Sequence, residues 1–561
     1  MKKILCATLL ALLTLSSYGS EYVTEVKVIQ GQFVEEKGST SKVSKIVDSP
    51  KETPIKKEVA PVKEPEVVVP EPSFDSKTTN LKEETISKED TEKNEEAAEN
   101  SSTSTAVAES HEEKASIANE TPEEPVSRVV DKSQYDFTKV HNLKVTEAPG
   151  VEKKSDYLRI NTRVTVLEEK TVGEKNPVKY SKIKYKKDKK VSTGWVKSNA
   201  LTDKITDTLP KNWASLDFTP MPKKNYKSNP RVAVKGIYVS ATSLSVTKSL
   251  DRLIDLANKT EINAFVIDVK NDDGHLLWKM PNVVEKNGIP SDTRSPFKDI
   301  APTIAKLKKN NIYLIARIVS FKDPTYAKTK TNKTIIDKRT GKPFTNADGL
   351  IWVSAHDRNL WQYNIDVAKE AAKAGFNEIQ FDYVRFPASN GGKLDPYLDY
   401  RNPNGESKPV AIQRYLKEAY KQLSPLEVYT AADVYGQVGT SPDDMALGQY
   451  WEAASNAVDY ICPMVYPSHY ANGTYGTKIP DAEPYKTVYG STRDSLNRDN
   501  NIDTPAIVRT WIQDFTARWV KGHINYGVTE VRAQIKALND LGLKEYILWN
   551  ASNRYSFEKI K

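Results

Sequence analysis

Three aspartates stand in apolar segments of this 561-residue chain, where their residue type is unexpected. They are Asp268 in AFVIDVK, Asp382 in EIQFDYV and Asp433 in YTAADVY. Because Asp is depleted within strands, each needs a reason: a structural hydrogen bond, an ion pair with Arg317 or Arg385, or catalysis. Two carboxyl groups, one ionised and one protonated, are what general acid–base catalysis and glycoside hydrolysis require.

We predict that Asp382 is the nucleophile or base and that Asp433 is the acid. Arg385 follows Asp382 by three residues, and a cation that meets the carboxylate would keep it ionised. Asp433 is flanked by two alanines and a valine, and apolar surroundings favour the protonated form. Asp268 and Lys270, expected on the same side of one strand, would bind substrate hydroxyls or support the site.

The residues that we expect to bind substrate stand near the ends of neighbouring apolar segments. They are Asp268, Lys270, Arg317, Arg385, Tyr466, Trp511 and Asn550. Aromatic rings beside carboxylates and amides suit sugars, which offer apolar C–H faces and hydroxyl groups.

Eight apolar segments rich in β-forming residues must position these side chains. They cover residues 234–240, 263–270, 312–321, 378–387, 427–436, 458–467, 505–515 and 546–552. Helical patterns lie between most of them, at 249–258, 300–309, 360–374, 410–422 and 529–540. The alternation predicts a parallel α/β fold, and eight units fit a (β/α)8 TIM barrel over residues 211–561, with its site at the C-terminal strand ends. A doubly wound open sheet is the alternative, although the phosphate-binding GxGxxG motif is absent.

The segment GFNEIQFDYVRFP, residues 375–387, resembles the signature of a bacterial family of barrels assigned as glycoside hydrolases. VKGIY at 234–238, FVIDVK at 265–270 and DYICPMVYPS at 459–468 resemble the same family. The resemblance implies a (β/α)8 fold and a glycosidase whose substrate it does not name. A more distant similarity to α-amylase and α-galactosidase barrels, in which a fourth-strand aspartate is the nucleophile, implies that role for Asp382.

Two other classes of function remain open. The barrel could bind carbohydrate or cell wall without catalysis. A metal hydrolase or deacetylase is less favoured, because no two of the six histidines have HxxxH or HxH spacing. Asp272 and Asp273 could hold Ca²⁺ but better suit a solvated turn. We therefore predict no metal and no cofactor.

The N-terminal quarter differs in composition from the rest. Residues 1–19 combine two lysines, an apolar run and a small-residue end, which is typical of a signal peptide and predicts export to the periplasm, cell surface or medium; an uncleaved anchor is the alternative. Residues 21–130 carry 25 acidic and 14 basic residues, and residues 37–130 have Phe74 as their one aromatic residue. This composition predicts a disordered acidic tether over 20–130, with a charged helix at 81–117 as the alternative.

Residues 131–205 alternate short apolar runs with turns, which predicts a small all-β barrel. LKV at 143–145, APG at 148–150 and GWV at 194–196 resemble a bacterial SH3-like domain. That resemblance implies peptidoglycan as a partner, and a spacer role stays open. The folded remainder is basic, yet a signal peptide and the lack of a recognition motif argue against nucleic-acid binding. No apolar run after the signal peptide is long enough to span a membrane.

Overall fold

The computed structural model describes residues 27–29, 32–34, 135–290 and 294–559. The predicted signal peptide, residues 1–19, lies outside these residues. So does almost all of the predicted tether, of which only strands β1 (Lys27–Ile29) and β2 (Gln32–Val34) are described, as an antiparallel pair.

In the described part of the chain, eight parallel strands close into a barrel, with β19 and β20 together forming the seventh. They are β10 (Lys235–Val239), β11 (Ala264–Lys270), β12 (Tyr313–Val319), β15 (Glu378–Asp382), β17 (Tyr429–Tyr435), β18 (Tyr460–Val465), β19 (Ile507–Val508) with β20 (Thr510–Gln513), and β21 (Tyr546–Trp549). Each strand pairs with the next, and β21 pairs with β10. This closure confirms the predicted (β/α)8 fold, and the open sheet is wrong.

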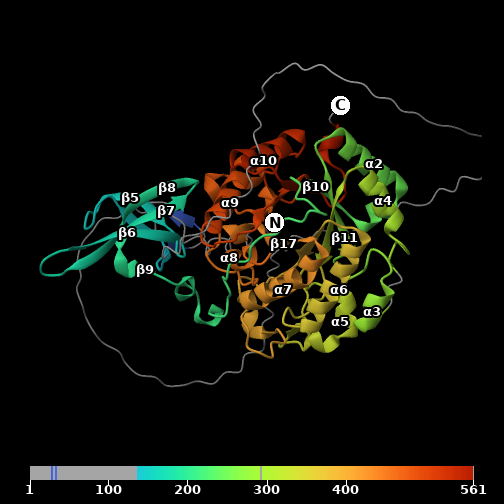
Figure 1. Ribbon diagram of the computed structural model, residues 1–561, viewed down its shortest axis with the longest axis horizontal. Coiled ribbons are helices and arrows are strands. Elements are labelled where there is room, and N and C mark those ends of the chain that lie inside the picture. The colour runs from blue at the N-terminus through green and yellow to red at the C-terminus, as the bar shows by residue number, and fades with distance from the viewer. Residues whose placement is uncertain (1–26, 30–31, 35–134, 291–293, 560–561) are drawn as a thin grey trace, which may run out of the picture.

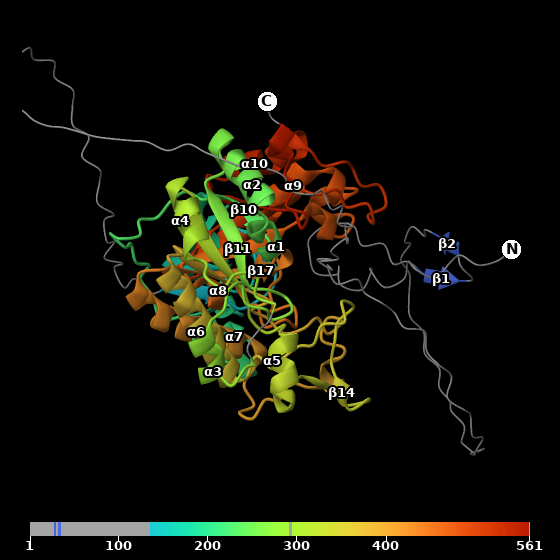
Figure 2. The same cartoon turned by 90° about the vertical axis from the view of Figure 1, so that its right-hand side faces the viewer.

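Helices surround the barrel, as Figures 1 and 2 show. They are α1 (Ala241–Ser245), α2 (Thr247–Lys259), α3 (Pro281–Lys286), α4 (Ala301–Lys309), α5 (Pro324–Thr329), α6 (Arg358–Ala374), α7 (Lys408–Leu423), α8 (Trp451–Ser455), α9 (Pro484–Asp499) and α10 (Val528–Asp540). Every residue of β11 and of β12 is buried, because the helices cover one face of each strand and the barrel interior covers the other. Among the described helices, none is both long and apolar enough to cross a bilayer.

Residues 135–202 form a separate antiparallel sheet. Its strands are β3 (Tyr135–Thr138), β4 (Leu143–Thr146), β5 (Lys154–Leu158), β6 (Arg163–Val172), β7 (Val178–Lys187), β8 (Lys190–Lys197) and β9 (Leu201–Thr202). Val145, Val164 and Ile183 are among its buried apolar residues. The strand-rich character predicted for 131–205 is present, and the SH3-like assignment stays a prediction.

Polar contacts join this sheet to the barrel beside α8 and α9 (Figure 1). Asn161 Nδ2 donates to the Tyr450 hydroxyl at 2.9 Å. At the β7–β8 turn, the Asp188 backbone N–H donates to Asn497 Oδ1 at 2.8 Å, and Asn497 Nδ2 donates back to Asp188 Oδ1 at 2.8 Å. The sheet is therefore docked on the side of the barrel.

Candidate active site

The C-terminal ends of the barrel strands bring the three predicted aspartates together. Asp268 on β11, Asp382 at the end of β15 and Asp433 on β17 are 4%, 5% and 1% exposed. Phe381 stands opposite Ala432 in the β15–β17 ladder, so Asp382 and Asp433 follow as neighbours on adjacent strands. The parallel register thus places two carboxyl groups side by side at the mouth of the barrel.

Arg317, on β12, lies between two of these carboxylates. Its Nη1 donates to Asp268 Oδ1 at 2.6 Å and its Nε to Asp382 Oδ2 at 2.8 Å, with Nη2 at 2.6 Å from the same oxygen. Tyr238 on β10 donates its hydroxyl to Asp268 Oδ2 at 2.5 Å. Because the guanidinium is fully buried, these charge-assisted bonds fix both carboxylates and compensate their charge. Arg317, which we expected to bind substrate, holds the site together.

Asp433 has the opposite environment. Trp511 on β20 donates its indole N–H to Asp433 Oδ1 at 2.7 Å, and Oδ2 has no hydrogen-bond partner among the described residues. Burial, and then the nearby charge of Asp382, raise the pKa of Asp433 well above its ordinary value. The protonated form of Asp433 is therefore favoured. Trp511, which we also predicted to bind substrate, is 1% exposed, and its indole N–H donates to Asp433.

The chain turns sharply directly after Asp382. Tyr383 has a φ of 46°, a left-handed conformation that bulky residues rarely adopt. Its backbone N–H donates to Asp382 Oδ1 at 2.5 Å. The turn and Arg317 thus hold one oxygen each of the Asp382 carboxylate, and strained backbone of this kind is typical of functional sites.

A narrow pocket opens at Asp382. Its lining residues are Asp382, Tyr383, Arg385, Tyr435, Met464, Tyr466 and His469. Its volume of about 20 Å³ is roughly that needed by one water molecule. The pocket can therefore hold one small group, such as a hydroxyl. Burial raises the pKa of Tyr466 well above its usual value, and the charges of Asp433 and Asp382 add to that rise. Burial lowers the pKa of His469 to about 4, so both rings are neutral at pH 7.

Arg385 lines this same pocket. It donates Nη1 to the Phe386 carbonyl oxygen at 3.1 Å, and its guanidinium lies 4.8 Å from the centre of the Trp352 ring. We predicted an ion pair between Arg385 and Asp382. In the structure, Arg317 makes the two short contacts with the Asp382 carboxylate.

Asp268 and Lys270 do not share a side of β11, so that expectation was wrong. Asp268 stands opposite Arg317 and Lys270 opposite Ile318, which leaves one extra residue between them and forms a β-bulge. Lys270 Nζ donates to Asp323 Oδ2 at 2.5 Å, and both side chains are fully buried. This ion pair lies against Tyr363 of α6, in the helical layer, and a role for Lys270 in the site stays a prediction.

Asn550 shapes the loop that follows β21. Its Nδ2 donates to the carbonyl oxygens of Asp514 and Arg554, each at 2.6 Å. Its Oδ1 accepts from Ser552. Contact between Asn550 and a sugar stays a prediction.

Two charged loops join the cluster and were not in the predicted site. Lys322 Nζ lies 3.0 Å from Asp272 Oδ1, 3.2 Å from Asp348 Oδ2 and 3.8 Å from the centre of the Tyr383 ring. Burial acts to raise the pKa of Asp272, but Lys322 and Arg317 outweigh it and lower that pKa to about 2. The available signal was the charged segments KNDD, residues 270–273, and FKDP, residues 321–324, at the ends of the second and third apolar runs. Among the described residues no group of three or more His, Cys, Asp or Glu could hold a metal ion.

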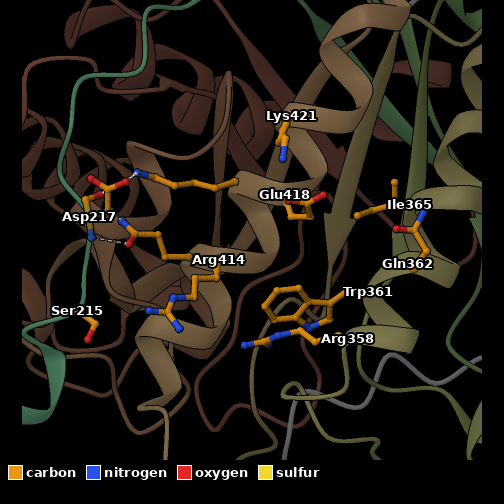
Figure 3. A pocket seen from close by; sticks show the side chains of 11 residues that line it. Ser215, Asp217, Arg358, Trp361, Gln362, Ile365, Arg414, Glu418 and Lys421 are labelled. Atoms are coloured by element: carbon orange, nitrogen blue, oxygen red, sulfur yellow. Dashed lines mark hydrogen bonds and ion pairs between the residues drawn. The ribbon is translucent and has the colours of Figure 1, made fainter. Parts of the chain in front are cut away.

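A larger hollow, of about 710 Å³, lies on the outer surface between α6 and α7 (Figure 3). Its lining residues are Ser215, Asp217, Arg358, Trp361, Gln362, Ile365, Gln413, Arg414, Lys417, Glu418 and Lys421. Asp217 is held by Lys417 Nζ at 2.5 Å, and Arg358 lies over the Trp361 ring at 3.6 Å. This hollow is on the helical layer, away from the strand ends and their carboxyl pair.

The comparison with protein families decides the assignment. Residues 236–555 match the family described as "Putative glycosyl hydrolase domain". The chain belongs to this family. The matched range covers the barrel except for Lys235, the first residue of β10, and contains every residue that lines the pocket at Asp382, so the barrel is assigned as a glycosidase domain.

No curated protein matches the chain. Solved structures similar to this glycosyl hydrolase chain include a hypothetical protein from Ruminiclostridium thermocellum, with 32% identity over 35% of this chain and 97% of that chain and a TM-score of 0.30. The glycoside hydrolase domain of PgaB (BpsB) from Bordetella bronchiseptica has 15% identity over 57% of this chain and 94% of that chain, with a TM-score of 0.41. An α-galactosidase from Thermus thermophilus in complex with stachyose has 13% identity over 71% of this chain and 75% of that chain, with a TM-score of 0.38.

Proposed function

We propose that the protein is an exported glycoside hydrolase that cleaves a poly- or oligosaccharide of the cell wall or cell surface with Asp382 and Asp433 as its carboxyl pair. The observation that carries the proposal is the contrast between these two neighbours. The Asp382 carboxylate is in contact with the Arg317 guanidinium. Asp433 is buried and has one oxygen without a hydrogen-bond donor among the described residues. Two neighbouring carboxyls in such different surroundings support the roles of a base and an acid.

The roles follow from those environments. Asp382, ionised, attacks the anomeric carbon or activates a water molecule. Asp433, protonated, gives its proton to the oxygen of the scissile glycosidic bond as that bond breaks. Arg317 and the Tyr383 N–H hold Asp382 in place, and Trp511 fixes the orientation of Asp433. The anomeric configuration of the first product, read by NMR, distinguishes retaining from inverting chemistry.

Two parts of the proposal depend on the sequence outside the barrel. Export is supported by the charged, apolar and small-residue order of residues 1–19. Peptidoglycan as a partner is supported by the SH3-like pattern of residues 131–205. A pull-down of the full chain on purified peptidoglycan tests the second part.

The experiment is to incubate the full chain with peptidoglycan, capsule polysaccharides and storage glycans and to identify products by mass spectrometry. Asp382→Asn and Asp433→Asn should each lower the rate on the hydrolysed glycan by about 10²–10⁴-fold, the usual contribution of general acid–base catalysis. Asp499→Asn is the matched control, because Asp499 likewise accepts from an indole N–H, that of Trp451 at 2.9 Å, but lies at the end of α9 and away from the strand ends. Full activity in either site variant would overturn the assignment. Binding of a glycan by the unsubstituted chain without turnover, in isothermal titration, would indicate a carbohydrate-binding scaffold instead.

A further inference from the structure

One aromatic side chain near the barrel mouth is left open to solvent. Trp519, on the loop that follows β20, is 68% exposed. A tryptophan ring is normally largely covered in a folded protein, because its apolar area is large. An indole presented in this way, on a loop at the catalytic end of a barrel, is suited to receive the apolar face of a ligand.

A continuous series of rings joins Trp519 to the pocket. Tyr466 and His469 line the pocket together with Asp382. Tyr466 lies 6.0 Å from Phe515, and Phe515 stacks on Trp519 with centroids 6.0 Å apart and planes at 21°. His469 lies edge-on to Trp519 at 6.4 Å. The exposed indole is therefore the outer end of a series of neighbouring aromatic rings that begins at the pocket beside Asp382, with Tyr466 buried, His469 and Phe515 partly exposed and Trp519 open to solvent.

The loop that carries Trp519 is held by hydrogen bonds. Gln513 Nε2 donates to the Phe515 carbonyl oxygen at 3.1 Å, and Gln513 Oε1 accepts from the Ser468 backbone N–H at 3.1 Å. The Tyr526 backbone N–H donates to Thr516 Oγ1 at 3.0 Å. These bonds tie the loop after β20 to the loop after β18, so less of this loop has to be ordered when a ligand binds.

We propose that Trp519 is the platform of a second sugar-binding position, and that the substrate is a glycan chain of several units that runs from Asp382 along His469 and Phe515 to Trp519. This inference rests on the proposed hydrolase function and names the kind of substrate. The C–H face of a pyranose ring stacks on the indole and displaces water from both surfaces. Arg518 and Lys521 flank the platform and are exposed, so a neutral or acidic glycan suits it better than a cationic one.

Fluorine NMR of the full chain labelled with 5-fluorotryptophan tests the platform without requiring turnover. The Asp382→Asn background prevents hydrolysis, and the resonance that Trp519→Phe removes is assigned to Trp519. The probes are hexasaccharides of β-1,4-linked N-acetylglucosamine, β-1,4-linked glucose, α-1,4-linked glucose and α-1,4-linked galacturonate, each beside its monosaccharide. We expect at least one hexasaccharide to shift the Trp519 resonance at a concentration at which its monosaccharide does not. No shift of this resonance with any hexasaccharide overturns the inference, as does an equal shift with the monosaccharide.

Kinetics separate this inference from the proposed function. For a probe that is hydrolysed, Trp519→Ala should lower the ratio of kcat/KM for the hexasaccharide to that for the disaccharide by about 3- to 10-fold, the effect of one aromatic contact. Leu426→Ala is the control, because Leu426 is 39% exposed and precedes β17 at the opposite end of the barrel. An unchanged ratio in Trp519→Ala overturns the inference and leaves the hydrolase function standing. A shift of the Trp519 resonance in a chain that hydrolyses no probe supports the platform and contradicts the function.

Discussion

The hydrogen bond from Trp511 to Asp433 allows a direct test of the two-carboxyl arrangement. Trp511→Phe removes the indole N–H that donates to Asp433 Oδ1 at 2.7 Å and keeps an aromatic ring in the space. Asp433 Oδ2 has no donor among the described residues, so the variant carboxyl loses its one described donor. A hydrogen bond to a charged group contributes about 1.5–3 kcal/mol, and one pKa unit corresponds to about 1.4 kcal/mol. The pKa of Asp433 should therefore rise by about 1–2 units.

The pH profile of kcat/KM measures this change. Asp433 acts in its protonated form, so activity is lost as the pH rises through its pKa. In Trp511→Phe the high-pH limb should move upward by about 1–2 pH units. A readout without substrate is the ¹³C NMR titration of the aspartate carboxyl carbons, in which the Asp433 signal is the one that Asp433→Asn removes.

Trp451→Phe provides the control for lost packing. It removes the indole donor of Asp499, a bond of 2.9 Å, from a carboxyl on α9 that we give no role in catalysis. This control should lose stability to a similar degree and leave the high-pH limb in place. If the limb also stays in place in Trp511→Phe, Asp433 is not the acid and the assignment of the pair fails.

Two further predictions concern the buried charges. Arg317→Met leaves the carboxylates of Asp268 and Asp382 without their cation and should lower the free energy of unfolding in urea by about 3–5 kcal/mol. Adding Asp268→Asn removes one of the two unpaired charges and should recover part of that loss. If no stability is recovered, the Arg317 ion-pair network is contradicted. Asp499→Asn should change how stability depends on pH, because burial raises the Asp499 pKa to about 7 from about 3.9 in the unfolded chain. The folded state holds this proton more tightly, so the stability it contributes is fully present below about pH 4 and is lost as the pH rises to about 7. Urea unfolding at both ends of that window should show this loss, up to about 4 kcal/mol, in the wild type and not in the variant; parallel curves would refute it.

The barrel could be predicted because its strands are buried on both faces. Such strands appear as continuous apolar runs, and all eight runs are strands of the closed sheet. Helix α9 was not predicted, because its buried face includes Thr487, Gly490, Ser491 and Ser495. Small polar residues give no apolar periodicity, so the sequence carried no helical signal there.

The site could be predicted by residue type and position, but its contacts could not. Apolar strands that contain Asp268, Asp382 and Asp433 pointed to the barrel mouth. Which cation meets Asp382 depends on contacts across neighbouring strands, where Arg317 reaches it. The bulge that turns Lys270 toward the helices has no local sequence signal, since one extra residue in a strand looks like any other.

Burial of charge does not by itself distinguish this site from the rest of the barrel. At the opposite end of the strands, Arg509 Nη1 lies 2.6 Å from Glu378 Oε1, and both side chains are fully buried. The second Glu378 oxygen accepts from the Tyr313 hydroxyl at 3.4 Å, so that pair has a structural explanation. Asp433 differs, because the one described donor to its carboxyl is the indole of Trp511 and not a cation, its Oδ2 has no donor among the described residues, and its neighbour Asp382 borders a pocket. A buried polar atom left unpaired costs stability and calls for an explanation, and a proton held ready for transfer supplies one.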